Sequence, residues 1–457
     1  MATATKQQQR PQLLQVAINA VFQPDIREKL LFTFALLVVF RFVSNLPVPG
    51  VDPAQLDAIF RNNTVLGFMN IFSGGALQNM SVAAMGVYPY ITSSIVMQLM
   101  VPIVPTLQAL SKEGEQGRKQ INTYTHWMTV PMALVQGYGQ LILVQSQGGF
   151  ASGTIELTGP NALPTVSAII TMTGGTMFLV WIGELISERG IGNGISILIF
   201  AGIVAGLPQF IGGRLYTGTG EGVSATIFLG TMMVLMVAYI VFFQEAQRKI
   251  PVQYSRSVFR SGRMYRQSGQ THIPLRVNTT GMIPLIFAFS IIIFPAYVGQ
   301  ILARPGSTGF LASAGDWVQS VFDPGNPGYW AFLFVTVVVF TFFYTMVVFQ
   351  QQNLAENLQR QGGFIPGIRP GRPTQEYINR VLMRITWGGA FFLGSVAVSP
   401  FVFSYLVGGA GGLNLRGRSA AFGITSSGLI IVVGVVLDTM RQIEAQLLMR
   451  QYEGFIR

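Results

Sequence analysis

The stretch that decides the fold of this chain runs from Ser187 to Pro208 and reads SERGIGNGISILIFAGIVAGLP. It is an apolar run that opens on three glycines within five residues: Gly190, Gly192 and Gly194. Glycine has no side chain, so two backbones can approach closely there, although the helix itself is weakened. Ile195 and Ile199 follow, four residues apart and therefore on one helix face. The pattern predicts a helix with a tightly packed entrance beside a narrow aliphatic passage. Glycine-rich packing in any multispanning membrane protein is the alternative.

The composition outside this stretch is that of a membrane protein. Half of the 457 residues are hydrophobic and only 10% are charged, which is too little charge to cover a soluble chain of this length. A bilayer is crossed by about 20 apolar residues. Ten runs reach or approach that length, and they predict an all-α polytopic membrane protein: about 30–46, 82–104, 124–145, 164–184, 191–211, 224–243, 282–302, 330–349, 384–407 and 422–437.

The basic residues are distributed unevenly around these runs. The net charge is +11, and with a cytoplasmic N-terminus most of the 29 Lys and Arg residues lie on the cytoplasmic side. This asymmetry follows the positive-inside rule and predicts that both termini are cytoplasmic. The start of the chain lacks the features of a cleaved signal peptide, so the first run is expected to remain as an anchor. The exceptions are Arg41 within the first run and five residues outside: Arg61, Arg214, Arg304, Arg416 and Arg418.

The residues needed for catalysis or ion coupling are scarce in the apolar runs. There is no cysteine, so disulfides and thiolate metal sites are excluded, and His126 and His272 are far apart in sequence. Glu184, Glu245 and Asp438 fall at the cytoplasmic ends of runs. Ion-coupled transporters keep such groups near the bilayer centre. The pattern therefore favours a passive channel over a secondary transporter for a small solute or an intramembrane enzyme, which are the alternatives.

Three segments between the runs are longer than a simple chain reversal requires. Residues 246–279 carry seven Lys or Arg and no acidic residue, and residues 350–383 include the turn-rich GGFIPGIRPGRP. Both are interpreted as docking loops; attraction to anionic lipid is the alternative. On the opposite side, 46–81 contains a moderately apolar part that is too short to span, which predicts a half-helix folded back at membrane depth.

Several motifs resemble the SecY family, the central subunit of the Sec protein-translocation channel, in the order in which that family has them. The resemblance covers about Arg27 to Phe455, nearly the whole chain. The motifs are FR followed by PVPG (Phe40 to Gly50), FSGGAL (Phe72 to Leu77), GVYPYITSSIVMQL (Gly86 to Leu99), KEGEQGRK (Lys112 to Lys119), SERGIGNGIS, THIPLRVN (Thr271 to Asn278), FIPGIRPGRPT (Phe364 to Thr374) and LLMRQYEGF (Leu447 to Phe455).

The resemblance implies two pseudo-symmetric five-helix halves that form a clam-shell around an hourglass pore. The expected organisation is a cytoplasmic segment 1–29, an N-terminal half 30–211, a C-terminal half 212–437 and a cytoplasmic tail 438–457. A ring of aliphatic side chains at the waist excludes water and ions while giving a passing chain nothing polar to bind. Ordinary core packing is the alternative for each of its members: Val87, Ile91, Ile195, Ile199, Ile286 and Ile431.

The resemblance also implies a plug and a lateral gate. The plug is expected within about 65–80, as a half-helix around Phe68 to Ala76, with Gly67, Phe68, Phe72, Gly74 and Gly75 as its residues. The spans at 86–101 and 282–300 are expected to face each other as the gate. Three polar residues are candidates to line the gate, with structural hydroxyl bonds to the backbone as the alternative: Thr92, Gln98 and Ser290.

The two basic loops are expected to dock the ribosome, whose RNA is anionic, or the SecA motor ATPase. The other partners that the resemblance implies are SecE-like and SecG-like small membrane subunits, polypeptides that bear signal sequences, and the lipids of the bacterial plasma membrane. No cofactor is implied. The docking candidates are Arg256, Arg260, Arg263, Arg266, Arg369 and Arg372.

Three places depart from the family pattern. Gln350 to Asn353 stands where relatives usually have a proline and a basic residue, which puts part of the motor contact in doubt. The last run opens with GITSSGLI (Gly423 to Ile430), a longer entry than usual, and this weakens the assignment of Ile431. The stretch from Ser255 to Gly269 is slightly lengthened.

Overall fold

The structure is a computed structural model that describes residues 23–48, 73–146, 162–215, 220–260, 263–278, 281, 283–302, 310–322, 326–352, 354–410 and 419–453. Helices dominate it: α2 (Pro24–Val43), α5 (Tyr88–Met100), α6 (Pro105–Lys112), α7 (Glu115–Ser146), α8 (Ala162–Arg189), α9 (Gly194–Leu215), α10 (Gly220–Glu245), α11 (Ile283–Leu302), α12 (Phe310–Val321), α13 (Pro327–Gln352), α14 (Leu354–Arg360), α15 (Arg372–Ala410) and α16 (Ser419–Glu453).

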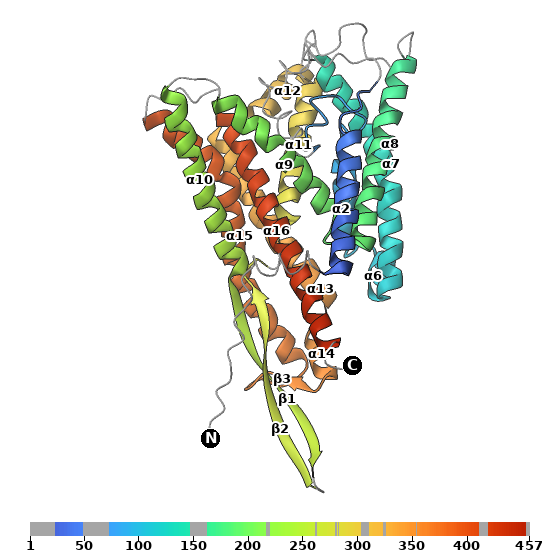
Figure 1. The fold of residues 1–457 in the computed structure, drawn as a ribbon, viewed down its shortest axis with the longest axis vertical. Coiled ribbons are helices and arrows are strands. Elements are labelled where there is room, and N and C mark those ends of the chain that lie inside the picture. Colours follow the sequence, from blue (N-terminus) through green and yellow to red (C-terminus); the bar gives the residue numbers. More distant parts are fainter. Residues whose placement is uncertain are drawn as a thin grey trace.

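The helices form an elongated bundle (Figure 1). The early helices α2, α7 and α8 lie on one side, and α10, α15 and α16 lie on the other. Helices α9 and α11 lie between these two groups in this view. A two-stranded hairpin projects from the lower end of the bundle, near α14 and the end of α16.

A helix overlaps each of the ten apolar runs predicted from the sequence. By length and composition, three helical stretches within the described residues could cross a membrane: Ala162–Arg189, Gly328–Arg360 and Arg372–Ser399. A fourth is the pair α5 and α6, which is bent by 97° at the break between them. Large apolar side chains are exposed along the outside of the bundle, including Phe34, Trp127 and Trp387, as in proteins whose outer surface meets lipid.

The run predicted at 82–104 is helical over only part of its length. Residues 73–87 form successive turns, and α5 begins at Tyr88. The reason is local, because Gly74, Gly75 and Gly86 have φ of +70°, +84° and +57°, values that a helix cannot contain. The described end of the predicted half-helix, Ser73 to Ala76, therefore consists of turns rather than helix.

The expectation of an all-α fold is wrong for the loop 246–279. Strands β1 (Gln247–Arg260) and β2 (Arg263–Arg276) form an antiparallel hairpin, with Gln247 opposite Arg276 and Arg260 opposite Arg263. The short strand β3 (Gly363–Phe364) pairs with β1, so the sheet order is β2-β1-β3. The signal was alternation: Ile250 and Val252 are buried while Lys249 is exposed, which is the period of a half-buried strand.

Candidate functional site

All six predicted ring residues lie in or against one hydrophobic cluster. Val87, Ile91, Ile199 and Ile431 are buried in it, and Ile195 and Ile286 pack against it partly buried. The cluster also contains core residues of many other helices, so membership does not by itself distinguish a ring from a core. The six come from four helices, α5, α9, α11 and α16, together with the residue that precedes α5. These helices therefore converge through aliphatic side chains.

The three glycines at the entrance of α9 are required by close contacts. A Cβ on Gly190 would lie 2.5 Å from the Thr33 hydroxyl oxygen of α2, and one on Gly192 would lie 2.8 Å from Ile197. Gly192 also has a φ of +83°, which favours glycine. A Cβ on Gly194 would collide with the backbone carbonyl of Gly183 in α8. The close backbone approach predicted for this stretch is confirmed.

Side-chain caps fix the first turn of α9. The Asn193 side-chain oxygen accepts a hydrogen bond from the Ser196 amide at 3.3 Å, as N-cap residues do. The Ser187 hydroxyl at the end of α8 accepts one from the Gly194 amide at 2.8 Å. Ser187 in turn donates to the Gly183 carbonyl at 2.9 Å. Helices α8 and α9 are thus joined where α9 begins, a few residues before Ile199.

The turn segment 73–87 connects the predicted plug region to α5. Gly67, Phe68 and Phe72 lie outside the described residues, whereas Gly74 and Gly75 are described. Gly74 is in contact with two helices, because a Cβ there would lie 2.8 Å from the Cα of Gly202 in α9 and 3.1 Å from the Phe40 ring in α2. The part of the plug region that can be described is therefore packed against a helix that carries ring residues.

Helices α5 and α11 are joined by a hydrogen bond that the sequence did not reveal. The Tyr88 hydroxyl, mostly buried, donates to the Ser290 backbone carbonyl at 3.1 Å. The predicted gate residues behave partly as structural groups: the Thr92 and Ser290 hydroxyls donate to the Pro89 and Ile286 carbonyls, both at 2.9 Å. Tyrosine in an apolar helix is typical of such a link, so GVYPY was the available signal.

Two further contacts involve the predicted gate residues on α5. The Thr92 hydroxyl also accepts a hydrogen bond from the Gln136 side chain of α7 at 3.1 Å. The Gln98 amide donates to Ser94 on its own helix at 3.2 Å. The first contact joins α5 to α7 and the second lies within α5, so neither reaches α11. Within the described parts of α5 and α11, the bond from Tyr88 to Ser290 joins the two helices directly.

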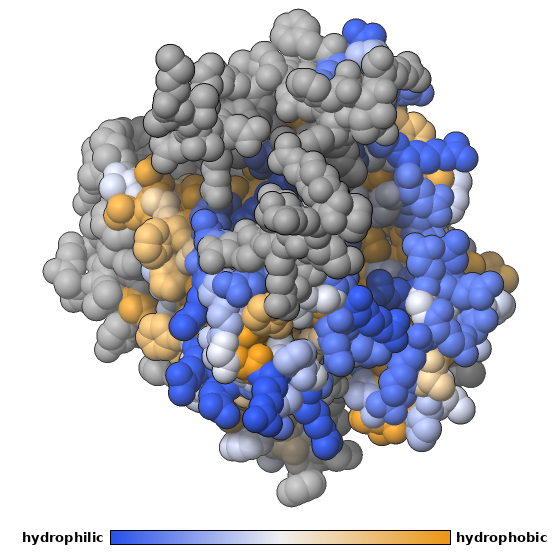
Figure 2. Space-filling view, turned by 90° about the horizontal axis from the view of Figure 1, so that it is seen from below, coloured by the Kyte–Doolittle hydropathy of each residue, from blue (hydrophilic) through white to orange (hydrophobic). Residues whose placement is uncertain are grey.

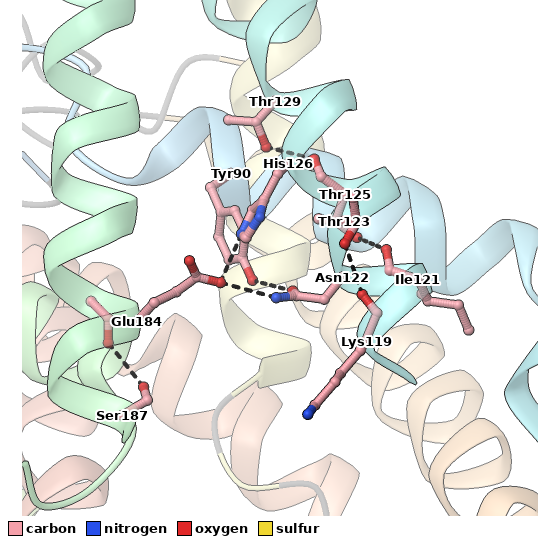
Figure 3. Close-up of polar contacts among 11 residues, drawn as sticks. Tyr90, Lys119, Ile121, Asn122, Thr123, Thr125, His126, Thr129, Glu184 and Ser187 are labelled. Atoms are coloured by element: carbon pink, nitrogen blue, oxygen red, sulfur yellow. Dashed lines mark hydrogen bonds and ion pairs between the residues drawn. The ribbon is translucent and has the colours of Figure 1, made fainter. Parts of the chain in front are cut away.

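A polar cluster ties α5 to α7 and α8 (Figure 3). Tyr90, next to Ile91, donates from its hydroxyl to the Asn122 side-chain oxygen at 3.2 Å. The Asn122 amide donates to a carboxylate oxygen of Glu184 at 3.0 Å, and His126 Nε2 lies 3.0 Å from the same oxygen. A carboxylate oxygen only accepts, so this contact is favourable when Nε2 carries the proton. Glu184, which the sequence placed at the end of a span, is the centre of this cluster.

The two predicted docking loops form one body below the bundle. Ile250, Val252 and Leu275 of the hairpin are buried with residues of α13, α14 and α15. β3 holds the second loop against the first, with Gln253 opposite Phe364. Two loops about a hundred residues apart in sequence therefore present one surface. Figure 2 shows that the described part of this end is mainly hydrophilic.

The predicted docking arginines lie at two places on this body. Arg369 and Arg372 are both exposed, Arg369 in the turn before α15 and Arg372 at the first residue of that helix. Gly367 and Gly371 flank Arg369 with φ of +82° and +104°, and the buried Thr374 donates to the Arg369 carbonyl at 2.8 Å. The turn-rich loop thus has a fixed shape. In the hairpin, Arg260 pairs with Arg263 at the tip, while Arg256 and Arg266 stand opposite Gln267 and Ser257.

A charged cluster joins the root of the hairpin to α10 and α16. Arg441 lies 2.6 Å from the Glu245 carboxylate and 3.8 Å from that of Asp438. Burial lowers the pKa of Arg276, and the charge of Arg441 lowers it further. Burial raises the pKa of Asp438, while the charges of Arg441 and Arg276 act in the opposite direction. No group of three potential metal ligands occurs in the parts of the chain that the structure covers.

Solved structures share the fold of this chain. The chain matches "The structure of a protein conducting channel" with a TM-score of 0.60 at 17% identity, covering 91% of both chains. It matches "Sec61 in the Canine ribosome-channel complex from the endoplasmic reticulum" with a TM-score of 0.57 at 16% identity and the same coverage. At these identities the likeness shows the fold, which is that of the SecY and Sec61 channels.

Sequence comparison identifies the family. The family model described as SecY matches residues 81–440. The protein translocase subunit SecY of Streptomyces galbus is 41% identical over 97% of this chain and 100% of the relative. That of Pseudomonas aeruginosa is 40% identical over 97% of this chain and 96% of the relative. The chain belongs to the SecY family, and the resemblance predicted from its motifs is confirmed.

Proposed function

We propose that this chain is the channel subunit of a bacterial protein translocase. It passes unfolded secretory polypeptides across the plasma membrane and releases hydrophobic segments sideways into lipid. It has no catalytic activity of its own, and transport is driven by the SecA motor or by the ribosome. The observation that carries this proposal is the convergence of α5, α9, α11 and α16 through six aliphatic residues, four buried in one hydrophobic cluster and two packed against it.

An aliphatic constriction suits a passive protein channel better than a transporter. Bulky apolar side chains expel water from a narrow pore and block ions, and they offer no hydrogen-bonding partner to a polypeptide that slides past. A transporter for a small solute needs a polar or charged site at the membrane midplane. In the described helices, Glu184 contacts His126 and Glu245 contacts Arg441, and both glutamates lie near the ends of their helices.

The topology follows from the same arrangement. Ten spans form two five-helix halves, 30–211 and 212–437, that close around the pore, with 1–29 and 438–457 in the cytoplasm. The separation of α2, α7 and α8 from α10, α15 and α16 in Figure 1 supports this division. Both basic loops project from one end of the bundle, which supports a cytoplasmic location for that end.

The remaining roles are assigned to individual residues. The segment at about 65–80 is the plug, anchored by Gly74 between α2 and α9. The lateral gate is the contact of α5 with α11, closed by the Tyr88 bond to Ser290 as well as by apolar packing. The body built from the two loops docks SecA or the ribosome, and SecE-like and SecG-like subunits cover exposed apolar faces of the bundle.

The proposal is tested by making the ring polar. Ile91→Asn and Ile199→Asn in the purified complex are expected to raise the resting ion conductance of planar bilayers, because the constriction becomes wet. Ile103→Asn is the matched control: it makes the same change at a residue that is 75% exposed and outside the cluster, and is expected to leave conductance as in the wild type. Unchanged conductance in both ring variants would overturn the ring and the channel proposed from it.

A further inference from the structure

Arg41 is the only charged residue in the first apolar run, 30–46, and it lies in the last turn of α2. A guanidinium beside an apolar bundle is costly unless its donors find acceptors. The acceptor for Arg41 lies 33 residues away in the sequence: the Nη1 of Arg41 donates a hydrogen bond to the backbone carbonyl of Gly74 at 2.9 Å. This bond crosses from α2 to the turn segment 73–87.

The position of Gly74 makes this bond informative. Gly74 has a φ of +70° and is pressed between the Cα of Gly202 and the Phe40 ring, so its carbonyl is held at the junction of α2 and α9. A side chain at this position would have to push the two helices apart. Next to it, Gly75 also has a left-handed φ of +84°, and a Cβ there would lie 3.9 Å from the same guanidinium of Arg41.

A second set of contacts fastens the same segment to the end of α2. The Val48 amide donates to the Met80 carbonyl, and the Val82 amide donates to the Leu46 carbonyl, both at 2.8 Å. Between them, Pro47 and Ser81 form an antiparallel bridge. These bonds hold the middle of the segment, whereas the Arg41 bond holds its beginning, at Gly74 within the proposed plug.

The segment is short and leads directly into the proposed ring. Ala76, two residues after Gly74, is fully buried in the cluster that contains Val87, Ile91 and Ile199. Val87 ends the segment and is the N-cap of α5. The turns between Gly74 and Val87 contain fully buried residues, among them Ala76, Leu77 and Met80, so the segment is a packed connection between Gly74 and the start of α5.

We propose that Arg41 is a positioning residue for the closed channel. By holding the Gly74 carbonyl, its guanidinium fixes the turn segment between α2 and α9 and so sets the resting positions of Val87 and Ile91. This inference rests on the proposed function, because it assigns a support to the proposed ring. Arg41 is not one of the six ring residues, and its hydrogen bond goes to the backbone of the turn segment.

The test compares Arg41→Met with Arg41→Lys in the complex that is used for the ring variants. Arg41→Met removes the donor and the charge, and is expected to raise resting conductance several-fold. Arg41→Lys keeps a charged donor, and is expected to restore most of the seal. The control is Arg27→Met, which makes the same change at an exposed arginine at the other end of α2, and is expected to conduct like the wild type.

A second measurement tests the proposal even if the Arg41→Met variant accumulates poorly in the membrane. The chain has no cysteine, so Ala76→Cys provides a single thiol at a fully buried position. In intact membranes, an impermeant thiol reagent is expected to label Ala76→Cys faster when Arg41→Met is also present. A purely structural loss would instead lower the amount of protein and leave the labelling rate of the inserted fraction unchanged.

The outcomes separate the two proposals. If Ile199→Asn leaks while Arg41→Met stays sealed and Ala76→Cys stays protected, the role of Arg41 is refuted and the channel stands. If Arg41→Lys leaks as much as Arg41→Met, the bond to Gly74 is not what matters, and the inference is overturned. If neither the ring variants nor Arg41→Met leak, both proposals are refuted.

Discussion

Gly194→Ala tests the feature on which the fold depends. Gly194 begins α9, and an added Cβ would collide with the Gly183 carbonyl and lie 2.8 Å from the Cβ of Ile186, both in α8. Neither neighbour is the end of a flexible side chain, so relief requires α8 and α9 to move apart. Such a shift also disturbs the 2.8 Å bond from the Gly194 amide to the Ser187 hydroxyl.

The size of the effect follows from two opposing contributions. Overpacking of this kind lowers the free energy of unfolding by about 1–3 kcal/mol. Replacing glycine with alanine in a helix offsets this by at most about 1 kcal/mol, and by less at the first helical position. We therefore expect a net loss of about 1–2 kcal/mol. Gly206, in the same helix, has open space where an alanine methyl would lie, with no atom outside the adjacent backbone of α9 within 4 Å, so Gly206→Ala is expected to gain about 0.5–1 kcal/mol.

The assay is thermal unfolding of both variants in one detergent, followed by the fluorescence of the five tryptophans at a single scan rate. Gly194→Ala is expected to unfold below the wild type and Gly206→Ala slightly above it. Resting conductance of Gly194→Ala is expected to rise as well, because Ile195 and Ile199 move with α9. If Gly194→Ala is as stable as Gly206→Ala, the tight α8–α9 contact is not present in the protein.

Two further predictions concern the polar cluster and the docking surface. Glu184→Leu is expected to lower the free energy of unfolding by about 1–3 kcal/mol, and Tyr90→Phe by about 1 kcal/mol. The double variant is expected to lose less than the sum of the two, because both side chains act through Asn122. Strictly additive losses in denaturation would contradict this. Arg369→Glu is expected to weaken binding to SecA, measured in neutral detergent, by about tenfold or more while stability stays unchanged. The same change at the exposed Arg380 is the control and is expected to have a smaller effect. Equal binding by both variants and the wild type would refute the docking role.

The sequence by itself determined the class of protein, because local composition carries that information. Long apolar runs, the scarcity of charge and the uneven distribution of Lys and Arg predict a multispanning membrane protein before any contact is known. The glycines near Gly194 indicated a close approach, since few other features demand three glycines in five residues. The ordered motifs then identified the family.

Only the tertiary structure decided what those residues touch. The partner of Arg41, the link from Tyr88 to Ser290 and the clustering of Glu184 with Tyr90 all join residues far apart in the chain, and no periodicity encodes such pairs. The hairpin was missed because its high charge resembled a solvated loop, although the buried Ile250 and Val252 alternate with the exposed Lys249 and Pro251. One face of the hairpin is buried against α13, α14 and α15, and this burial is the reason that buried and exposed residues alternate along the strand.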